Sequence, residues 1–441
     1  MDRDADQLAR AVTPRVAVVG AGWAGLAAAV AATTRGHAVT LFEMAAQAGG
    51  RARSLATGEP RLDNGQHLLI GAYAATLALM RQVGVDPEAV LRRQPLALLD
   101  QDGRGLRLPA GHPVLAFSRA VWAMSHWSLG ERLALSRAAL GWMRARFRCE
   151  ASLTVAQLSA RLPSRVRAEI IDPLCVAALN TPATTASAAV FLRVLQDALF
   201  AGPGSSDLLI PRRPLAELLP EPALAWLARH GADLRAGQRV QSLQPGPAAA
   251  GWRLDDEPFD QVILACSSTE AARLTRGIAP DWSARAAGLR HEPILTAYVQ
   301  APGARLAAPM VALREGPDAP AQFAFDHGAL GATPGLFALV VSGATPWVQR
   351  GPADSAAALL RQAGEVLRPL HAGGRSPAAT LLQVIAEKRA TFLCTPGLSR
   401  PPARIAAGLL AAGDGIDGPY PATLEGAVRS GRAAADLLAP P

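Results

Sequence analysis

The hydrophobic pattern near the N-terminus predicts a strand, a helix and a second strand in immediate succession. Residues 16–19 form a continuous apolar run, VAVV, as expected for a strand that is buried on both faces. An alanine-rich helical stretch follows and ends near Gly36, and residues 37–42 then have the pattern of a second strand. This order predicts a βαβ unit with a parallel sheet, and therefore an α/β fold.

Glycines occupy the turn between the first strand and the helix, in the sequence GAGWAG. Gly20 permits a tight strand-to-helix turn, Gly22 lets the backbone approach a pyrophosphate, and Gly25 lets the helix pack closely on the strand. Trp23 and Ala24 then begin the helix, whose N-terminus offers free N–H groups to phosphates. The turn therefore predicts a dinucleotide-binding site of the Rossmann type.

An acidic residue, Glu43, closes the second strand. Its carboxylate can accept hydrogen bonds from ribose hydroxyls, whereas it would repel a 2′-phosphate. A second glycine pair with an arginine, Gly49-Gly50-Arg51, follows it. This pair is not part of a minimal NAD motif. It resembles the segment that runs beneath the pyrophosphate in the flavin amine oxidase and phytoene desaturase superfamily, so the resemblance implies FAD as the cofactor.

The C-terminal stretch resembles the closing motif of the same superfamily. Residues 409–412 have the pattern of a short buried strand, Gly413-Asp414 follows, and a helix is expected to start at Pro421 and Ala422. The resemblance implies that Asp414 meets the ribityl and phosphate end of the flavin. It also implies that the backbone of Ala422 and Thr423 faces the isoalloxazine ring, where a positive helix end stabilises negative charge.

A third cofactor segment is expected in the middle of the chain. Residues 237–243 alternate like a strand, and the resemblance places the backbone of Val240 against the adenine. The implied fold is a glutathione reductase-like, Rossmann-type FAD-binding domain interleaved with an α+β substrate domain, an amine oxidase-like architecture. The expected FAD-binding domain comprises 14–72, 205–270 and 400–441, and the substrate-binding domain comprises 73–204 and 271–399.

One short segment changes abruptly from polar to apolar. The polar run Asp63-Asn64-Gly65-Gln66-His67 leads directly into Leu68-Leu69-Ile70. In the implied fold this segment reaches the reactive face of the flavin. We expect Gly65 and Gln66 to contact the ring, and Leu68, Leu69 and Ile70 to line an apolar substrate cavity.

The same segment is similar to that of plant-type carotenoid desaturases, and more closely to that of the hydroxysqualene dehydroxylase family, the squalene-associated flavin desaturases. Further segments carry this closer resemblance, and they are 173–182, 206–211, 387–392 and 421–431. It implies an FAD-dependent oxidoreductase that reduces hydroxysqualene to squalene in hopanoid biosynthesis, with loss of water.

A chemical route follows as a hypothesis. Departure of the allylic hydroxyl leaves a delocalised cation, which hydride from the reduced flavin N5 quenches. His67 is the candidate acid or leaving-group binder, and its alternative role is to hold the turn by hydrogen bonding. Asn180 is a candidate for the substrate pocket, with a turn or cap as its alternative role. Lys388, flanked by Glu387 and Arg389, is expected to be solvated.

Three other functions remain open at this point. A carotenoid-type desaturase would share the fold and the kind of substrate, with the opposite electron flow. An amine oxidase would need an aromatic cage beside the flavin, and the chain has three tyrosines. A prenyl-lipid-binding protein without flavin, like the Rab GDP-dissociation inhibitors, would not need Glu43, Gly49-Gly50-Arg51 or Asp414.

The composition limits the kinds of partner that the protein is expected to bind. The 441 residues carry a formal charge of +8, almost all of it from arginine spread along the chain, so no nucleic acid partner is expected. Four scattered cysteines predict reduced thiols and no metal site. The N-terminus lacks the apolar region of a secretory signal, and no apolar run is long enough to span a bilayer.

Residues 114–150 combine Trp122, Trp127, Trp142, Met143 and Phe147 with many arginines. Such a composition is typical of a helix pair that docks on a membrane interface, and the alternative is that these helices only cap the substrate domain. We therefore expect a cytoplasmic protein at the inner face of the cytoplasmic membrane. The electron donor to the flavin is not indicated by the sequence.

Overall fold

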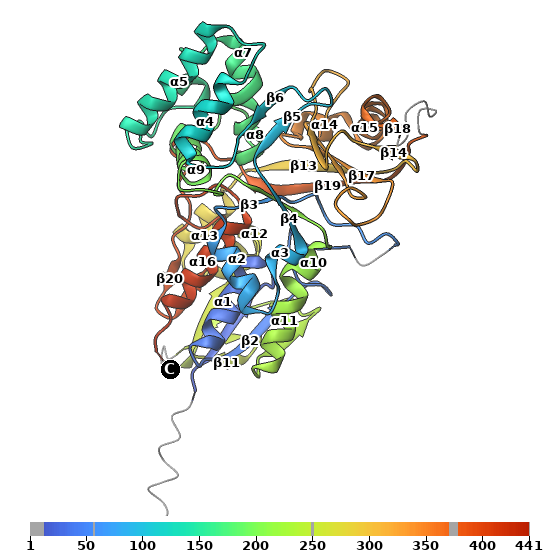
Figure 1. Ribbon diagram of the computed structural model, residues 1–441. Helices are drawn as coiled ribbons and strands as arrows, with labels where there is room; N and C mark the ends of the chain where they lie inside the picture. The colour runs from blue at the N-terminus through green and yellow to red at the C-terminus, as the bar shows by residue number, and fades with distance from the viewer. Residues whose placement is uncertain (1–12, 56–57, 248–250, 370–377, 441) are drawn as a thin grey trace, which may run out of the picture.

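The computed structural model describes residues 13–55, 58–247, 251–369 and 378–440. The first twelve residues, on which the expectation about a secretory signal rests, lie outside this part. The chain forms two joined parts, one around a six-stranded sheet and one around a five-stranded sheet, with a group of helices beside the second sheet (Figure 1).

The six-stranded sheet contains the predicted βαβ unit. Its strands, in spatial order, are β20 (Arg404–Ala406), β21 (Leu409–Ala411), β12 (Gln261–Leu264), β1 (Arg15–Val19), β2 (Ala38–Glu43) and β8 (Asp233–Ala236). All neighbouring pairs are parallel except β20 and β21. The sheet thus gathers segments from the beginning, middle and end of the chain.

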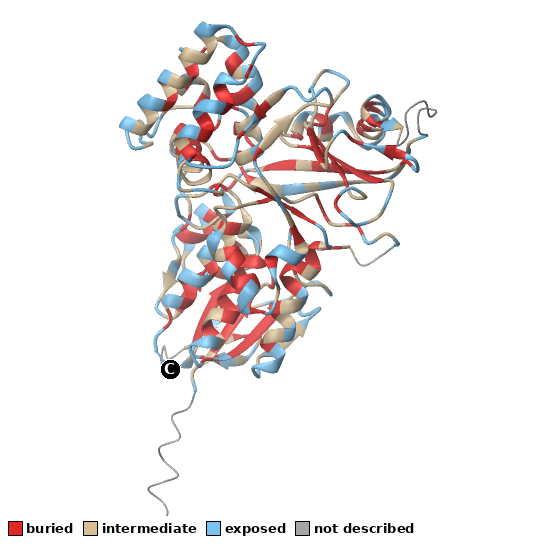
Figure 2. Ribbon diagram, in the orientation of Figure 1, coloured by how far each residue is buried: buried red, intermediate tan, exposed pale blue. Residues whose placement is uncertain are grey.

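Alternation along β1 explains how both faces of this sheet are covered. Val16 and Val18 contribute to a core with α1 (Trp23–Thr34), α11 (Pro220–Arg229) and α16 (Leu424–Asp436). Ala17 and Val19 contribute to a core on the opposite face, with β9–β11 (243–245, 252–254 and 257–259), α12 (Ser268–Thr275) and α13 (Pro280–Ala287). Burial on both faces is why the strand sequence is continuously apolar (Figure 2).

The helix α2 (Ala74–Gln82) also belongs to the first part. The buried carboxylate of Glu425 in α16 accepts hydrogen bonds from the backbone N–H groups of Ala75 and Thr76, at 3.0 and 2.9 Å. Leu77 and Met80 join the same core as α1. The domain boundary expected at residue 72 therefore separates a helix from the domain on which it packs; the remaining boundaries stay predictions.

The second part is built on an antiparallel sheet. Its strands are β15 (Met310–Ala312), β16 (Phe323–Asp326), β17 (Leu336–Val341), β13 (His291–Gln300) and β19 (Thr380–Phe392). The helices α14 (Thr345–Arg350) and α15 (Pro352–Val366) share a core with one face of this sheet. A parallel Rossmann-type sheet beside an antiparallel sheet is the α/β, amine oxidase-like architecture that the sequence predicted.

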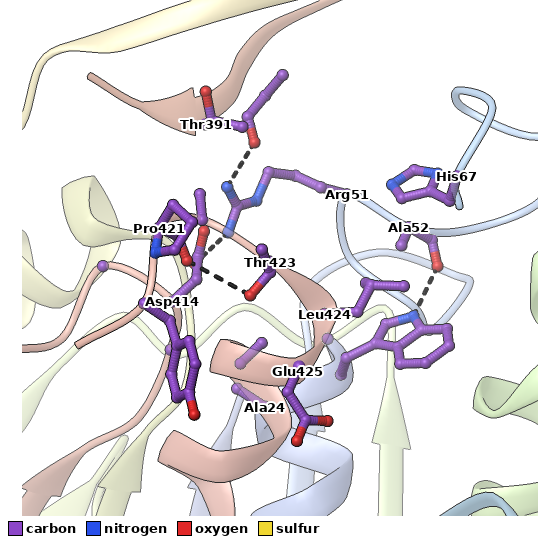
Figure 3. Close-up of a pocket in the computed structure, with 18 of the residues that line it drawn as sticks. Ala24, Arg51, Ala52, His67, Thr391, Asp414, Pro421, Thr423, Leu424 and Glu425 are labelled. Carbon is purple, nitrogen blue, oxygen red and sulfur yellow. Dashed lines mark hydrogen bonds and ion pairs between the residues drawn. The ribbon is translucent and has the colours of Figure 1, made fainter. Parts of the chain in front are cut away.

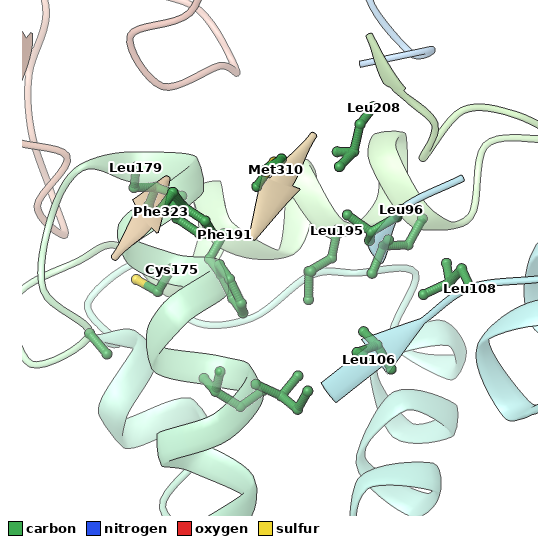
Figure 4. Packing of buried hydrophobic residues seen from close by; sticks show 14 of the residues in the cluster. Leu96, Leu106, Leu108, Cys175, Leu179, Phe191, Leu195, Leu208, Met310 and Phe323 are labelled. Atoms are coloured by element: carbon green, nitrogen blue, oxygen red, sulfur yellow. The ribbon is translucent and has the colours of Figure 1, made fainter. Parts of the chain in front are cut away.

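The other face of the second sheet shares a core with a group of helices. They are α4 (Pro113–Trp122), α5 (Leu129–Arg144), α6 (Val155–Leu158), α7 (Ser164–Val166), α8 (Asp172–Leu179) and α9 (Ala188–Leu199). Phe191 and Leu195 of α9 lie near Met310 and Phe323 of the sheet in this core (Figure 4). A small sheet of β3 (Leu69–Ile70), β7 (Leu208–Pro211) and β4 (Leu91–Gln94) connects the two parts.

Two elements differ from the sequence prediction. Of residues 237–243, which were predicted as one strand, only Leu243 lies in a strand: β8 ends at Ala236 and β9 begins at Leu243. The amides of Gln241 and Ser242 instead donate to the carboxylate of Asp255, so they are not available to a neighbouring strand. The C-terminal helix begins at Leu424 rather than at Pro421, because the side chain of Thr423 caps it by accepting from the amide of Gly426.

The close contact of α1 with α16 yields a prediction. A Cβ atom on Gly431 would lie 2.1 Å from the backbone oxygen of Ala24, so Gly431→Ala should force the helices apart. We expect a loss of stability of about 1–3 kcal/mol, measured by denaturant unfolding. Gly141→Ala in α5 is the matched control: a Cβ there has no atom within 4 Å, so that variant should be neutral or slightly more stable.

Candidate active site

The glycine turn after β1 brings the backbone close to a large cavity. Gly20 has a φ of 106°, and a Cβ there would lie 2.8 Å from the backbone oxygen of Ala265. A Cβ on Gly25 would lie 1.8 Å from the oxygen of Gly20, so only glycine lets α1 approach its own strand here. Gly22, Trp23 and Ala24 line the cavity beside Gly20, which leaves the N-terminus of α1 facing it.

The second glycine pair lies directly against the first. Gly49 donates its N–H to the oxygen of Ala21 at 2.8 Å, and a Cβ on Gly50 would lie 3.1 Å from the Cα of Gly22. The indole Nε1 of Trp23 donates to the oxygen of Ala52 at 3.0 Å, which fixes the second segment to α1 (Figure 3). The two turns thereby form one continuous wall of the cavity.

Arg51 connects this wall to two distant segments. Its guanidinium forms an ion pair with Asp414 and donates to the oxygen of Ala390 in β19 at 2.8 Å. The charge of Asp414 raises the pKa of Arg51. The loop before α16, with Gly413, Ala422 and Thr423, lines the cavity next to this pair. The C-terminal segment and the glycine pair thus meet as the sequence predicted.

The opposite end of this polar region holds Glu43 and Val240. The carboxylate of Glu43 accepts from the N–H of Ala21 at 2.7 Å and from that of Ala45 at 2.8 Å, and it still has free acceptor positions for hydroxyl groups. The backbone oxygen of Val240 accepts from Arg273 at 2.6 Å. Both residues line the cavity, and their roles toward ribose and adenine stay predictions.

The cavity has a volume of about 1,460 Å³ and extends from these polar residues to an apolar region. Pockets for single small ligands are typically about 300–1,000 Å³, so the space exceeds the usual requirement of one such ligand. The apolar wall is formed by Leu96, Phe191, Leu195, Met310, Phe323, Phe325 and Val340. The glycine cradle, the helix N-terminus and Glu43 fit a bound FAD at the polar end.

The polar segment 63–67 lies where these two regions meet. The carboxylate of Asp63 accepts from Ser54 at 2.6 Å and from the N–H of Leu215 at 3.0 Å, and burial raises its pKa to about 6. Asn64 donates to the carboxylate of Glu387 at 2.9 Å. The segment is thus fixed at one end, while Gly65, Gln66 and His67 line the cavity.

His67 is half-buried, and its Nδ1 lies 3.0 Å from the oxygen of Gly65. A carbonyl oxygen can only accept, so this contact assigns the proton of the neutral ring to Nδ1 and leaves Nε2 as an acceptor. Burial is the main cause that lowers the pKa of His67, and Arg51 acts in the same direction. The ring is therefore mostly neutral at pH 7. It holds the turn, and it is a proton donor toward the cavity only when it is protonated.

The apolar residues after His67 alternate. Leu68 and Ile70 line the cavity, as predicted, but Leu69 is fully buried in the core with α1 and does not line it. The expectation that all three residues face the substrate was wrong for Leu69, because successive side chains of a strand point to opposite faces. Strand β3 therefore contributes both to the cavity wall and to the core that contains α1.

Asn180 borders the cavity, but its amide is engaged in the fold. The residue has a positive φ of 46° and ends α8. Its side chain donates to Thr391 at 2.9 Å and to the oxygen of Glu292 at 3.2 Å, and it accepts from the N–H of Gly343 at 2.7 Å. These bonds support the turn role that the sequence left open beside a role in the pocket.

Sequence reasoning missed several polar residues of the cavity. Glu387 was named as a neighbour of Lys388 and as part of the segment 387–392 but was given no role in the site, yet it lines the cavity and contacts Asn64. Tyr420 donates to Asp197 at 3.0 Å and has Arg193 and Arg429 beside its ring, at 5.2 and 5.4 Å. The alternation of side chains along the strand at 380–392 was the one available signal for Glu387. It places Glu387 on the same face of the strand as the apolar residue Ile385.

Comparisons with known proteins agree with this geometry. The model of the family "Flavin containing amine oxidoreductase" matches residues 23–439. The chain is 30% identical to a hydroxysqualene dehydroxylase of Rhodopseudomonas palustris, over 96% of this chain and 98% of the relative. A zeta-carotene desaturase of Synechocystis is 36% identical, but over only 20% of this chain and 19% of its own.

A crystal structure of an oxidoreductase from Methanosarcina mazei has the same fold. It is similar with a TM-score of 0.71 and 17% identity, and the match covers 95% of this chain and 99% of that one. The predicted resemblance, the fold class and FAD as cofactor are confirmed by these comparisons.

The bridge made by Arg51 yields a prediction. In Arg51→Met the carboxylate of Asp414, whose side chain is 12% exposed, loses its cation next to the expected FAD phosphates. We expect FAD binding to weaken by about tenfold or more, measured by titrating FAD into the flavin-depleted protein. Arg35→Met removes an arginine of similar exposure that pairs with Asp436, and it should leave the affinity unchanged. Equal losses in both variants would contradict the prediction.

Proposed function

The chain belongs to the flavin containing amine oxidoreductase family and is an FAD-dependent oxidoreductase, and we propose that its substrate is the polyisoprenoid alcohol hydroxysqualene. In this proposal the enzyme reduces hydroxysqualene to squalene with loss of water, as a step of hopanoid biosynthesis. The supporting observation is one cavity that combines a polar cofactor region with a long apolar wall.

The apolar wall suits the substrate and the chemistry. Loss of an allylic hydroxyl produces a delocalised cation that water would capture, so the reaction needs a site from which water is excluded. Phe191, Phe323 and Val340 supply hydrocarbon and aromatic surface and no competing nucleophile. An apolar chain enclosed there also loses its contact with water, which favours binding.

The residues at the polar region have separate tasks. Asp414, Arg51 and the N-terminus of α16 hold and orient the cofactor, and reduced FAD supplies a hydride when it is bound. His67 protonates the departing hydroxyl from Nε2, so that the C–O bond breaks and the oxygen leaves as water. Because the Nδ1–H is held by Gly65, the ring keeps the orientation that this transfer needs.

A carotenoid-type desaturase remains the second candidate. Its supporting observation is the local similarity to a zeta-carotene desaturase, which covers a fifth of the chain.

The proposal includes a location for the protein in the cell. A C30 hydrocarbon dissolves in a bilayer rather than in water, so the enzyme must meet it at a membrane. We propose a peripheral position at the inner face of the cytoplasmic membrane, where an electron donor of unknown identity reduces the flavin.

The decisive experiment for this function is an anaerobic turnover. The purified flavoprotein is photoreduced, hydroxysqualene is added, and the oxidised flavin band is followed while the extracted lipid is analysed. We expect the band to return and squalene to form. If the band does not return, and the oxidised enzyme is instead bleached by phytoene or a related polyene, the protein is a desaturase and the proposed direction of electron flow is wrong.

The role of His67 predicts a pH dependence. An acid acts in its protonated form, and the pKa of His67 is lowered from its ordinary value near 6.5. The single-turnover rate should therefore rise as the pH falls from about 8 to about 5, and His67→Gln should abolish this rise together with most of the rate. A histidine that only holds the turn would leave the slope unchanged in the variant.

A further inference from the structure

Exposed apolar side chains are concentrated on one helix pair. Among the described residues, six large hydrophobic side chains are exposed, and four of these lie on α4 and α5. They are Leu115, Trp122, Leu129 and Leu140, with exposed fractions of 57, 47, 60 and 42%. We call these four residues and the arginines between them the α4–α5 face. The pair lies at the end of the molecule opposite the Rossmann-type sheet (Figure 1).

On each of the two helices, helical spacing places the exposed apolar residues and the arginines on one side. Leu115 and Trp122 are seven residues apart on α4, with Arg119 between them, while Phe117 and Val121 are buried against the core. On α5, Leu129 and Leu140 share a side with Arg137 and Arg144, and Leu135 and Ala139 point to the core. Each helix therefore has a buried apolar side and an exposed side on which leucine or tryptophan alternates with arginine.

The charge of this helix pair has one sign. Residues 113–148 contain six arginines and one acidic residue, Glu131. Glu131 is engaged in capping α5, where its carboxylate accepts from the N–H of Ser128 at 2.7 Å. No ion pair forms at Arg119, Arg137 or Arg144 within the described residues. Unpaired cations beside exposed leucine and tryptophan match the surface of an anionic bilayer, which offers both negative headgroups and hydrocarbon.

The cavity reaches the surface next to these helices. Ala201 and Pro203 both line the cavity and are exposed, so the cavity opens to the surface there; we call this opening the mouth at 201–203. Phe200, directly before them, packs its ring against Phe117 of α4 at 5.6 Å and against Phe147 after α5 at 5.2 Å. The mouth and the helix pair are thus joined through one aromatic cluster.

We propose that the α4–α5 face docks on a bilayer that contains anionic phospholipid, and that the mouth at 201–203 takes up the polyisoprenoid directly from it. The inference rests on the proposed function only for the identity of the molecule that is taken up. Within the described residues no helix has the length and apolar character for crossing a membrane. The alternation of exposed leucine or tryptophan with arginine on α4 and α5 is what assigns the contact to interfacial depth.

The structure also changes which aromatic residues are expected to contact the membrane. Trp127 is buried and donates to Glu169 at 2.7 Å, and Trp142 and Phe147 pack against the core. Of the aromatic residues that suggested an interfacial helix pair in the sequence, Trp122 is the exposed one, and its neighbours on the face are leucines. The docking residues are thus mainly different from those that the composition indicated.

Sedimentation with vesicles tests the surface independently of catalysis. The wild-type flavoprotein is mixed with vesicles of phosphatidylcholine alone, or of equal parts phosphatidylcholine and phosphatidylglycerol. We expect strong binding to the mixed vesicles only. The double variant Leu115→Glu, Trp122→Glu should lose about tenfold or more of this binding, and Arg137→Gln, Arg144→Gln should lose the preference for phosphatidylglycerol.

Leu382→Glu is the matched control, because Leu382 is a leucine of similar exposure, 44%, on β19 rather than on the α4–α5 face. It should bind vesicles like the wild type. Failure of the wild type to bind mixed vesicles, or an equal loss in the control, overturns the docking proposal. Binding that behaves as expected in a protein that does not convert hydroxysqualene leaves docking established and refutes the proposed substrate instead.

A second measurement addresses the uptake route. With the substrate dispersed in detergent, the double variant should turn over at the wild-type rate, since Leu115 and Trp122 do not line the cavity. With the substrate dissolved in mixed vesicles, its rate should fall in proportion to its lost binding. Equal rates of wild type and variant on vesicle-bound substrate would show that uptake does not pass through this face.

Discussion

The contact between Arg51 and Asp414 holds the site together. It joins a turn near the N-terminus, the last loop of the chain and, through the oxygen of Ala390, a strand of the second sheet. A charge pair in the wall of a cavity is stable only if both partners keep good geometry, because neither is fully solvated. The two parts of the molecule are therefore fixed relative to one another at the place where the cofactor must bind.

The cavity takes its two chemical characters from the two parts. The first supplies backbone groups and a helix N-terminus, made accessible because Gly20, Gly25 and Gly50 have no side chains. The second supplies the apolar side chains of α9 and of its sheet. Residues 63–70 cross between them, which is why polar residues and leucines follow one another so abruptly there. Glu387 and His67 both line the cavity at this boundary.

The position of α4 and α5 explains how one protein can bind both a polar cofactor and a lipid substrate. The cofactor region lies in the part with the Rossmann-type sheet, and the exposed apolar side chains lie on α4 and α5, at the opposite end of the molecule and beside the second sheet (Figure 1). A molecule docked by α4 and α5 thus keeps its flavin region away from the bilayer, while the mouth at 201–203 stays close to it.

The sequence by itself determined the local and strongly patterned features. The glycine turn, Glu43 and the strand–helix–strand order are constraints within about 30 residues, where chain geometry leaves few alternatives. The resemblance located the C-terminal motif and the cofactor. Tertiary structure decided the rest: which side of β3 each leucine faces, where the helix after Thr423 begins, and that α2 packs on α16. It also decided that Trp127 is buried while Leu115 and Leu129 are exposed. These outcomes depend on which distant segment covers each surface, and composition and spacing do not encode that.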